Sequence, residues 1–106
     1  MNSNLLHVFQ KKIHSFFKSK RINHELISDS ALDTLKILKK NNFDAFIVGG
    51  AIRDILMGYK PKDFDIATNA TPEQVRSIFK KSRIIGRRFK LVHVIYGREI
   101  IEVSTF

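Results

Sequence analysis

The chain has 106 residues, of which 43% are hydrophobic; this is enough for one domain with its own core and too little for two. It contains no cysteine, which excludes disulfide frameworks and thiolate metal sites, and its short apolar runs exclude a membrane-spanning helix. Its 19 lysines and arginines against 10 acids give a net charge of +9, which favours polyanionic partners such as RNA, DNA, nucleotides or acidic lipid.

Residues 1–27 are predicted to form a basic N-terminal extension, and its stretch 1–21 contains no acid. Apolar residues recur there near helical spacing from Leu5 to Phe17, with lysines on the rest of the turn. This pattern is typical of a helix that packs on its parent protein, of a partly disordered tail, or of a basic arm that contacts RNA; a membrane-surface helix is a further alternative. Its charges interrupt the apolar stretch that a signal peptide needs, so we expect a soluble cytoplasmic protein.

Residues 28–106 are predicted to form a single folded domain. Its first half contains a helix, a buried strand, a second helix and a second strand, at residues 31–40, 44–48, 51–57 and 64–68. We expect Ser30 to cap the first helix, because a serine hydroxyl can accept a hydrogen bond from a free N–H group at a helix start. Glycines are expected to end the first strand and the second helix, namely Gly49, Gly50 and Gly58.

The second half begins with a strong helix start, in which Thr71 can cap, Pro72 suits the first helical position and Gln74 completes a capping box. This helix is predicted to end near Lys80. Three strands follow, and a hairpin turn over 96–98 joins the last two; the strands are expected at residues 83–85, 90–96 and 99–105. These elements predict a mixed sheet of about five strands backed by helices, in the α+β or α/β class.

The residues that carry chemistry begin with a glycine pair, Gly49 and Gly50, at the junction between a strand and a helix. A glycine pair there lets the backbone approach a ligand closely, and free N–H groups at the helix start favour an anion. Tight packing explains such a pair about as well, since neither GxGxxG nor a GxxxxGK phosphate loop is present. The helix that follows holds two charged residues, Arg53 and Asp54.

Asp63 and Asp65 form a pair of carboxylates on the second predicted strand. Residues i and i+2 of a strand point to the same face, so we expect their side chains to lie close together. Two neighbouring carboxylates repel each other without a cation, and carboxylate oxygens are ligands that Mg²⁺ prefers. The sequence therefore predicts a site for Mg²⁺ or Mn²⁺, against the simpler alternative that one aspartate caps a turn and the other lies in solvent.

Glu102 is a third candidate carboxylate, on a strand otherwise built for burial. It either joins the metal site or forms an ion pair on the sheet face with a nearby arginine. His93 lies in the apolar stretch LVHVIY and is interpreted as a hydrogen-bonded structural histidine.

Basic residues accompany these carboxylates. Lys62 directly precedes the aspartate pair, and Arg87 and Arg88 follow Gly86 between two predicted strands. Guanidinium groups bind phosphates through paired hydrogen bonds, so contacts with a nucleotide or an RNA strand are expected. The alternative is a solvated basic edge that discourages aggregation.

The linked motifs at residues 49–54 and 63–73 resemble the head domain of class II nucleotidyltransferases, the family of bacterial CCA-adding enzymes and bacterial poly(A) polymerase. The resemblance covers about residues 24–106, and the stretches 84–94 and 97–106 are more similar to the poly(A) polymerase branch. It implies a polymerase-β-like α+β fold. It also implies template-independent, metal-dependent transfer of AMP from ATP to an RNA 3′ end, with CCA addition to tRNA as the alternative.

The resemblance implies roles for the matching residues. The catalytic metals would be bound by Asp63 and Asp65, and Glu102 matches a strand acid that joins the two aspartates in some members. The residues that would bind the nucleotide are Gly49, Gly50, Arg53 and Asp54. The residues that would contact RNA or phosphate are Lys62, Arg87 and Arg88.

Family members continue beyond the head with neck, body and tail domains, whereas this sequence ends at Phe106. The expectation is that the chain is a fragment or a truncated product, so a non-catalytic RNA-binding remnant is a further alternative. The expected partners are ATP and an RNA 3′ end. No membrane partner is expected, and the oligomeric state is left open.

Overall fold

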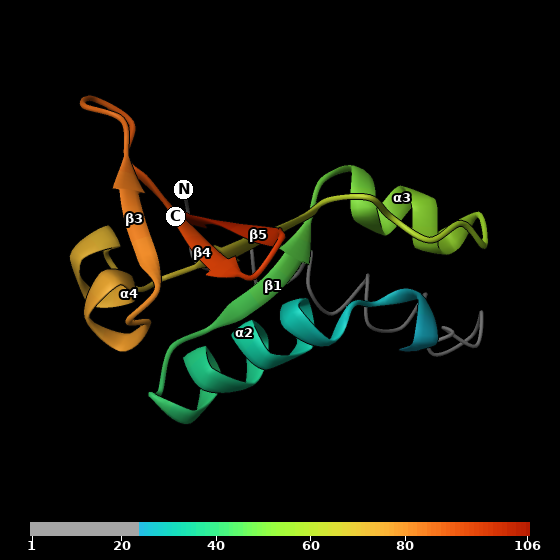
Figure 1. Ribbon diagram of the computed structural model, residues 1–106, viewed down its shortest axis with the longest axis horizontal. Helices are drawn as coiled ribbons and strands as arrows, with labels where there is room; N and C mark the ends of the chain where they lie inside the picture. Colours follow the sequence, from blue (N-terminus) through green and yellow to red (C-terminus); the bar gives the residue numbers. More distant parts are fainter. Residues whose placement is uncertain (1–23) are drawn as a thin grey trace.

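The computed structural model describes residues 24–106 and shows one mixed sheet of five strands (Figure 1). The strands are β1 (Ala45–Val48), β2 (Phe64–Thr68), β3 (Ser82–Ile85), β4 (Leu91–Tyr96) and β5 (Glu99–Thr105). Their order in the sheet is β1-β2-β5-β4-β3, with β2 and β5 parallel and the other neighbours antiparallel. The predicted α+β fold with a five-stranded mixed sheet is confirmed.

The helices within residues 24–106 are η1 (His24–Leu26), α2 (Asp29–Lys40), α3 (Gly50–Leu56) and α4 (Pro72–Ile78). The α2 helix begins two residues earlier than predicted, because its cap is Ser28 and not Ser30. The Ser28 hydroxyl accepts a hydrogen bond of 3.1 Å from the backbone N–H of Ala31. Ser30 lies inside the first turn, where its carbonyl accepts a hydrogen bond from the Thr34 hydroxyl.

The start of α4 is as predicted. The Thr71 hydroxyl accepts a hydrogen bond of 3.1 Å from the Gln74 N–H, and the Gln74 side chain accepts one of 2.8 Å from the Thr71 N–H. The helix ends at Ile78, two residues before the predicted end, because Phe79 adopts an extended conformation and buries its ring in the core. Burial of this aromatic ring therefore outweighs continuation of the helix.

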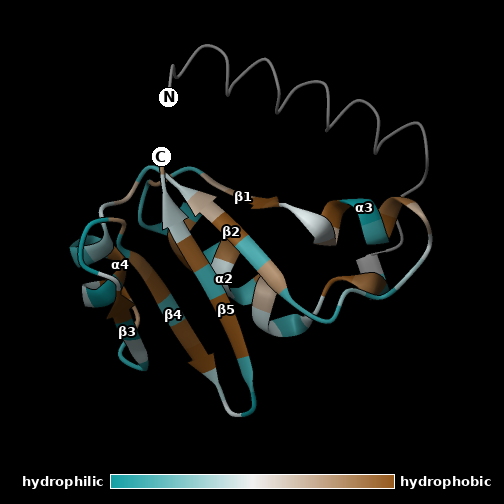
Figure 2. Cartoon of the chain, turned by 90° about the horizontal axis from the view of Figure 1, so that it is seen from above, coloured by the Kyte–Doolittle hydropathy of each residue, from teal (hydrophilic) through white to brown (hydrophobic). Residues whose placement is uncertain are grey.

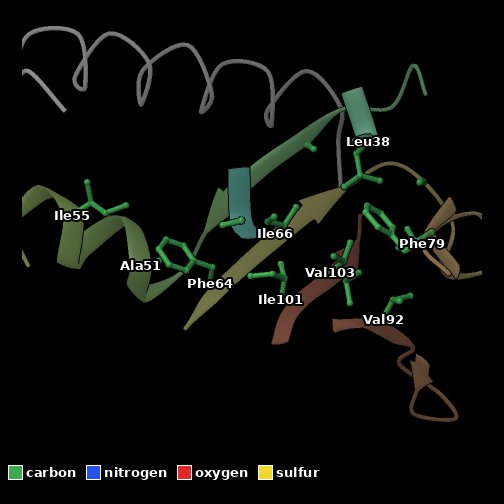
Figure 3. Packing of buried hydrophobic residues seen from close by; sticks show 14 residues of the cluster. Leu38, Ala51, Ile55, Phe64, Ile66, Phe79, Val92, Ile101 and Val103 are labelled. Atoms are coloured by element: carbon green, nitrogen blue, oxygen red, sulfur yellow. The ribbon is translucent and has the colours of Figure 1, made fainter. Parts of the chain in front are cut away.

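The core lies between one face of the sheet and the helices (Figure 3). Alternate residues of the two central strands are fully buried, and they pack with Leu38 of α2: these are Phe64, Ile66, Ile101 and Val103. Full burial of a side chain of this size stabilises a fold by roughly 1.5–3 kcal/mol. The remaining residues of each strand must therefore project from the opposite side.

We call that opposite side the open face. Alternation and strand register place on it Phe46, Val48, Asp65, Ala67, Arg83, Ile85, Leu91, His93, Ile95, Ile100, Glu102 and Ser104. All of these residues are half-buried or exposed. Figure 2 shows a hydrophilic band on each of β2, β5 and β4 near the middle of the sheet.

The predicted helical segment at residues 1–21 lies outside the described residues. Leu26 and Ile27, which the predicted division assigns to the N-terminal extension, pack against the core. No helix among residues 24–106 combines the length and the apolar character needed to cross a bilayer.

Candidate active site

A row of polar side chains crosses the middle of the open face. The strand register pairs Asp65 of β2 with Glu102 of β5, Glu102 with His93 of β4, and His93 with Arg83 of β3. Paired residues on neighbouring strands project to the same side of a sheet. We call these four residues the polar row, and in it the structure brings Glu102 directly beside Asp65.

Gly49 lies against the carboxylate of Asp65. Its φ of +77° is in a region that glycine adopts readily and other residues rarely adopt. A Cβ atom built at Gly49 would lie 3.3 Å from Oδ2 of Asp65, so a side chain here would press on the carboxylate. The structure therefore brings the predicted glycine pair and the second aspartate together, although they are well separated in sequence.

The first turn of α3 places a guanidinium group beside the same glycines. A Cβ atom at Gly50 would lie 3.4 Å from Nη2 of Arg53, and this nitrogen is 3.5 Å from Oδ1 of Asp54. The Arg53 side chain is 73% exposed, and ion pairs at such positions hold the partners weakly. The Arg53 guanidinium therefore remains accessible to an anion at the start of α3.

The two aspartates fit a hard divalent cation. Asp63, in the residue before β2, is exposed, and Asp65 is half-buried. Neither carboxylate forms a hydrogen bond or ion pair within residues 24–106, so their oxygens are free to coordinate. No group of three His, Asp or Glu side chains in that range is arranged to hold a metal. Two carboxylates are a donor set of the kind that holds Mg²⁺ together with water and substrate phosphates.

The charged neighbour of Glu102 on the sheet face is His93 and not the arginine of the predicted ion pair. The Nε2 atom of His93 lies 3.7 Å from Oε2 of Glu102, and the two side chains are both partly exposed. This separation exceeds a hydrogen bond, so the contact is an ion pair only when His93 is protonated. His93 thus belongs to the polar row, and within the described residues it forms no side-chain hydrogen bond of the kind that its structural interpretation required.

The predicted phosphate-contacting residues divide into two places. Lys62 is exposed and directly precedes Asp63 in the chain. Arg87 and Arg88 are exposed between β3 and β4, at the edge of the sheet three strands away from β2. At about 4.8 Å for each strand, β3, which leads into the loop that carries these arginines, lies on the order of 14 Å from β2, the strand of Asp65. The two arginines therefore lie apart from Lys62 and the carboxylates.

Residues 45–106 match a family model described as the poly(A) polymerase head domain. Over 85 residues the chain is 55% identical to poly(A) polymerase I of Salmonella typhi, and over 74 residues it is 42% identical to the CC-adding tRNA nucleotidyltransferase of Halalkalibacterium halodurans. These matches cover 80% and 70% of this chain but 18% and 20% of the relatives. The chain therefore spans about a fifth of the length of the curated relatives that it matches.

A solved structure shows the same fold. The CCA-adding enzyme of Bacillus stearothermophilus, crystallised in complex with CTP, matches with a TM-score of 0.66 at 43% identity. The match covers 72% of this chain and 19% of that enzyme. The predicted polymerase-β-like nucleotidyltransferase fold is thereby confirmed.

Proposed function

The chain belongs to the poly(A) polymerase head-domain family, and from this premise we propose that it is the catalytic head of an enzyme that transfers AMP from ATP to RNA 3′ ends. The observation that carries the proposal is the contact between Gly49 and the Asp65 carboxylate, with Glu102 beside it. This arrangement leaves room for phosphates next to free carboxylate oxygens. Under the proposal residues 28–106 form the head and residues 1–27 a basic extension. Both partners, ATP and RNA, are available in the cytoplasm, where the protein would act.

The proposed reaction needs no covalent enzyme intermediate. The RNA 3′ hydroxyl attacks the α-phosphorus of ATP, the bond to the bridging oxygen breaks, and pyrophosphate leaves. Asp63 and Asp65 would hold Mg²⁺ or Mn²⁺, which when bound lowers the pKa of the hydroxyl and neutralises charge on the phosphoryl oxygens. Glu102 adds negative charge beside Asp65 and so strengthens the hold on a cation.

The residues around the carboxylates would orient the nucleotide. Without a side chain, Gly49 lets the phosphates approach Asp65, and Gly50 leaves the start of α3 clear. The exposed Arg53 guanidinium would hold the leaving pyrophosphate, and its weak 3.5 Å contact with Asp54 would leave it accessible for this. Lys62 adds positive charge next to Asp63, where the polyanionic substrate must enter.

CCA addition to tRNA is the second candidate, because the solved CCA-adding enzyme has the same fold at 43% identity. Polyadenylation is favoured by the greater identity to poly(A) polymerase I, 55% against 42% for the CC-adding relative. The two functions differ in their product. A poly(A) polymerase makes a homopolymeric tail, whereas CCA addition stops at a defined end.

The test is incorporation of labelled ATP or CTP into a short RNA in the presence of Mg²⁺. It uses the 106-residue chain and a chimera in which the 85 matching residues of this chain replace the corresponding region of Salmonella typhi poly(A) polymerase I. We expect the chimera to add a long tail of A only. A product that ends in CCA supports the second candidate, and RNA binding with no incorporation by the chimera overturns the enzymatic proposal in favour of a non-catalytic remnant.

A further inference from the structure

The loop between β3 and β4, residues 86–90, carries an aromatic ring that the fold leaves in solvent. Phe89 is 87% exposed, more than any other large hydrophobic residue in the part of the chain that the structure describes. Its neighbours in the loop are all cationic: Arg87, Arg88 and Lys90. Single-stranded nucleic acids are bound by this combination, in which aromatic rings stack on bases and cations hold the backbone.

The backbone of this loop is held in a defined conformation. Gly86 has a φ of +98°, and a Cβ atom there would collide with the carbonyl oxygen of Phe89. The two residues therefore pack backbone to backbone. In addition, Nζ of Lys90 lies 3.6 Å from Oε1 of Glu73, which links the loop to α4. The backbone of Phe89 is thus packed against Gly86 while its ring stays exposed, so the loop presents the ring to solvent from a defined backbone position.

The position of the loop suits an RNA that extends from the proposed catalytic centre. Figure 1 shows the loop projecting past the end of β3, away from the helices. The polar row leads from Asp65 on β2 to Arg83 on β3, over a distance on the order of 14 Å. An RNA strand that has its 3′ end at Asp65 and crosses the open face therefore reaches β3, the edge strand that contains Arg83 and leads into the loop.

We propose that Phe89 stacks on an unpaired base of the RNA upstream of its 3′ end, while Arg87 and Arg88 hold the flanking phosphates. The choice of RNA as the polyanion rests on the proposed function. A protein partner is less favoured, because three cations flank Phe89 in the sequence and only one of the three, Lys90, has an acidic partner within residues 24–106. Stacking accepts any base, so the contact would guide the RNA without selecting its sequence.

Fluorescence tests the contact directly, because the chain contains no tryptophan. The Phe89→Trp variant of the 106-residue chain reports on this loop alone, whatever other surfaces bind RNA. We expect saturable quenching by an oligo(A) RNA and little quenching by heparin, a polyanion without bases. RNA binding, followed by anisotropy of a labelled RNA, with no quenching overturns the proposal, and so does equal quenching by heparin.

Affinity measurements supply a second, independent test. Phe89→Ala should weaken binding of oligo(A) by about 5- to 100-fold, whereas Phe89→Tyr should bind like the parent chain. The matched control is Met57→Ala, since Met57 is 63% exposed outside the loop, and we expect no change. Phe89→Ala should leave the salt dependence of binding unchanged, whereas Arg87→Ala should lower its slope by about one.

The two proposals fail in different ways. If Phe89→Ala binds RNA as the parent does while the chimera adds nucleotides, the stacking contact is wrong and the catalytic proposal stands. If the chimera adds no nucleotide but oligo(A) quenches Phe89→Trp, the catalytic proposal is wrong and the stacking contact stands. If the chain binds no RNA at all, the stacking proposal is overturned.

Discussion

The carboxylate of Asp65 lies between the backbone of Gly49 and the side chain of its strand neighbour Glu102. Asp65→Asn keeps the size of the side chain and removes the charge that would hold a cation. Because Asp65 has no partner within residues 24–106, the fold should be unaffected. We expect nucleotide incorporation by the chimera to fall at least about 10²- to 10³-fold, as when one stabilising group is removed from a transition state.

The control for this substitution is Asp33→Asn, which removes an exposed carboxylate from α2. Its incorporation rate should match that of the parent chimera, with unchanged thermal unfolding for both variants. Near-normal turnover of Asp65→Asn with Mg²⁺ would falsify the assignment of this carboxylate to the metal site.

Alanine substitutions at Gly49 and Gly58 separate the effect of backbone strain from the effect on the proposed nucleotide site beside Asp65. Both have positive φ, +77° and +81°, but a Cβ atom at Gly49 meets Asp65 at 3.3 Å and one at Gly58 meets nothing within 4 Å. Both alanine variants should lose about 1–3 kcal/mol of unfolding free energy in urea, because alanine rarely adopts such a conformation. Gly49→Ala alone should also weaken binding of ATP with Mg²⁺, by about tenfold or more. Equal nucleotide affinity in the two variants contradicts the proposed phosphate position.

The α2 helix and strand β4 are joined by a hydrogen bond between side chains. The Thr34 hydroxyl donates to the Ser30 carbonyl at 2.8 Å, so at 2.9 Å it accepts from the Tyr96 hydroxyl. Burial raises the pKa of Tyr96 above its ordinary value of 10.0. Since the phenol ionises more readily in the unfolded chain, the free energy of unfolding should fall as pH rises above about 10.

Tyr96→Phe tests this element contact. Near neutral pH the variant should be less stable by about 0.5–1.5 kcal/mol, the usual contribution of one hydrogen bond. Its unfolding free energy should then depend less on pH than that of the parent between about pH 9 and pH 11. Urea unfolding at the two pH values measures this difference. If the unfolding free energies of the parent and the variant change equally with pH, Tyr96 does not titrate as argued.

Neighbouring elements could be predicted from the sequence where local geometry determines them. The strands at 64–68 and 99–105 have the predicted bounds, because alternation and the turn at Gly97 delimit them. That two-residue turn also fixes the hairpin register, in which residue 93 lies opposite residue 102. The pairing of His93 with Glu102 could therefore have been predicted from the sequence. The cap of α2 could not, because two serines, Ser28 and Ser30, suit the position about equally.

The whole molecule decides what local patterns leave open. In sequence β3 and β4 precede β5, yet β5 lies between β4 and β2 in the sheet. Strand order depends on packing between distant segments, so the sequence could not predict the separation of Arg87 and Arg88 from the aspartates. This order produces an acidic centre on an otherwise basic protein. A polyanion can bind across it favourably only when a cation offsets the carboxylates.

The net charge of +9 predicts how RNA affinity responds to salt, and the basic extension supplies a measurable share of it. Five of the 19 lysines and arginines lie before His24: Lys11, Lys12, Lys18, Lys20 and Arg21. If each neutralises one phosphate, replacing all five with glutamine should lower the slope of log affinity against log salt by about 3.5 for a single strand. The matched control replaces Lys36 and Lys39, exposed on α2, and should change the slope little. An unchanged slope in the first variant, with a lower midpoint of urea unfolding, would instead show that the extension packs on the domain and does not contact RNA.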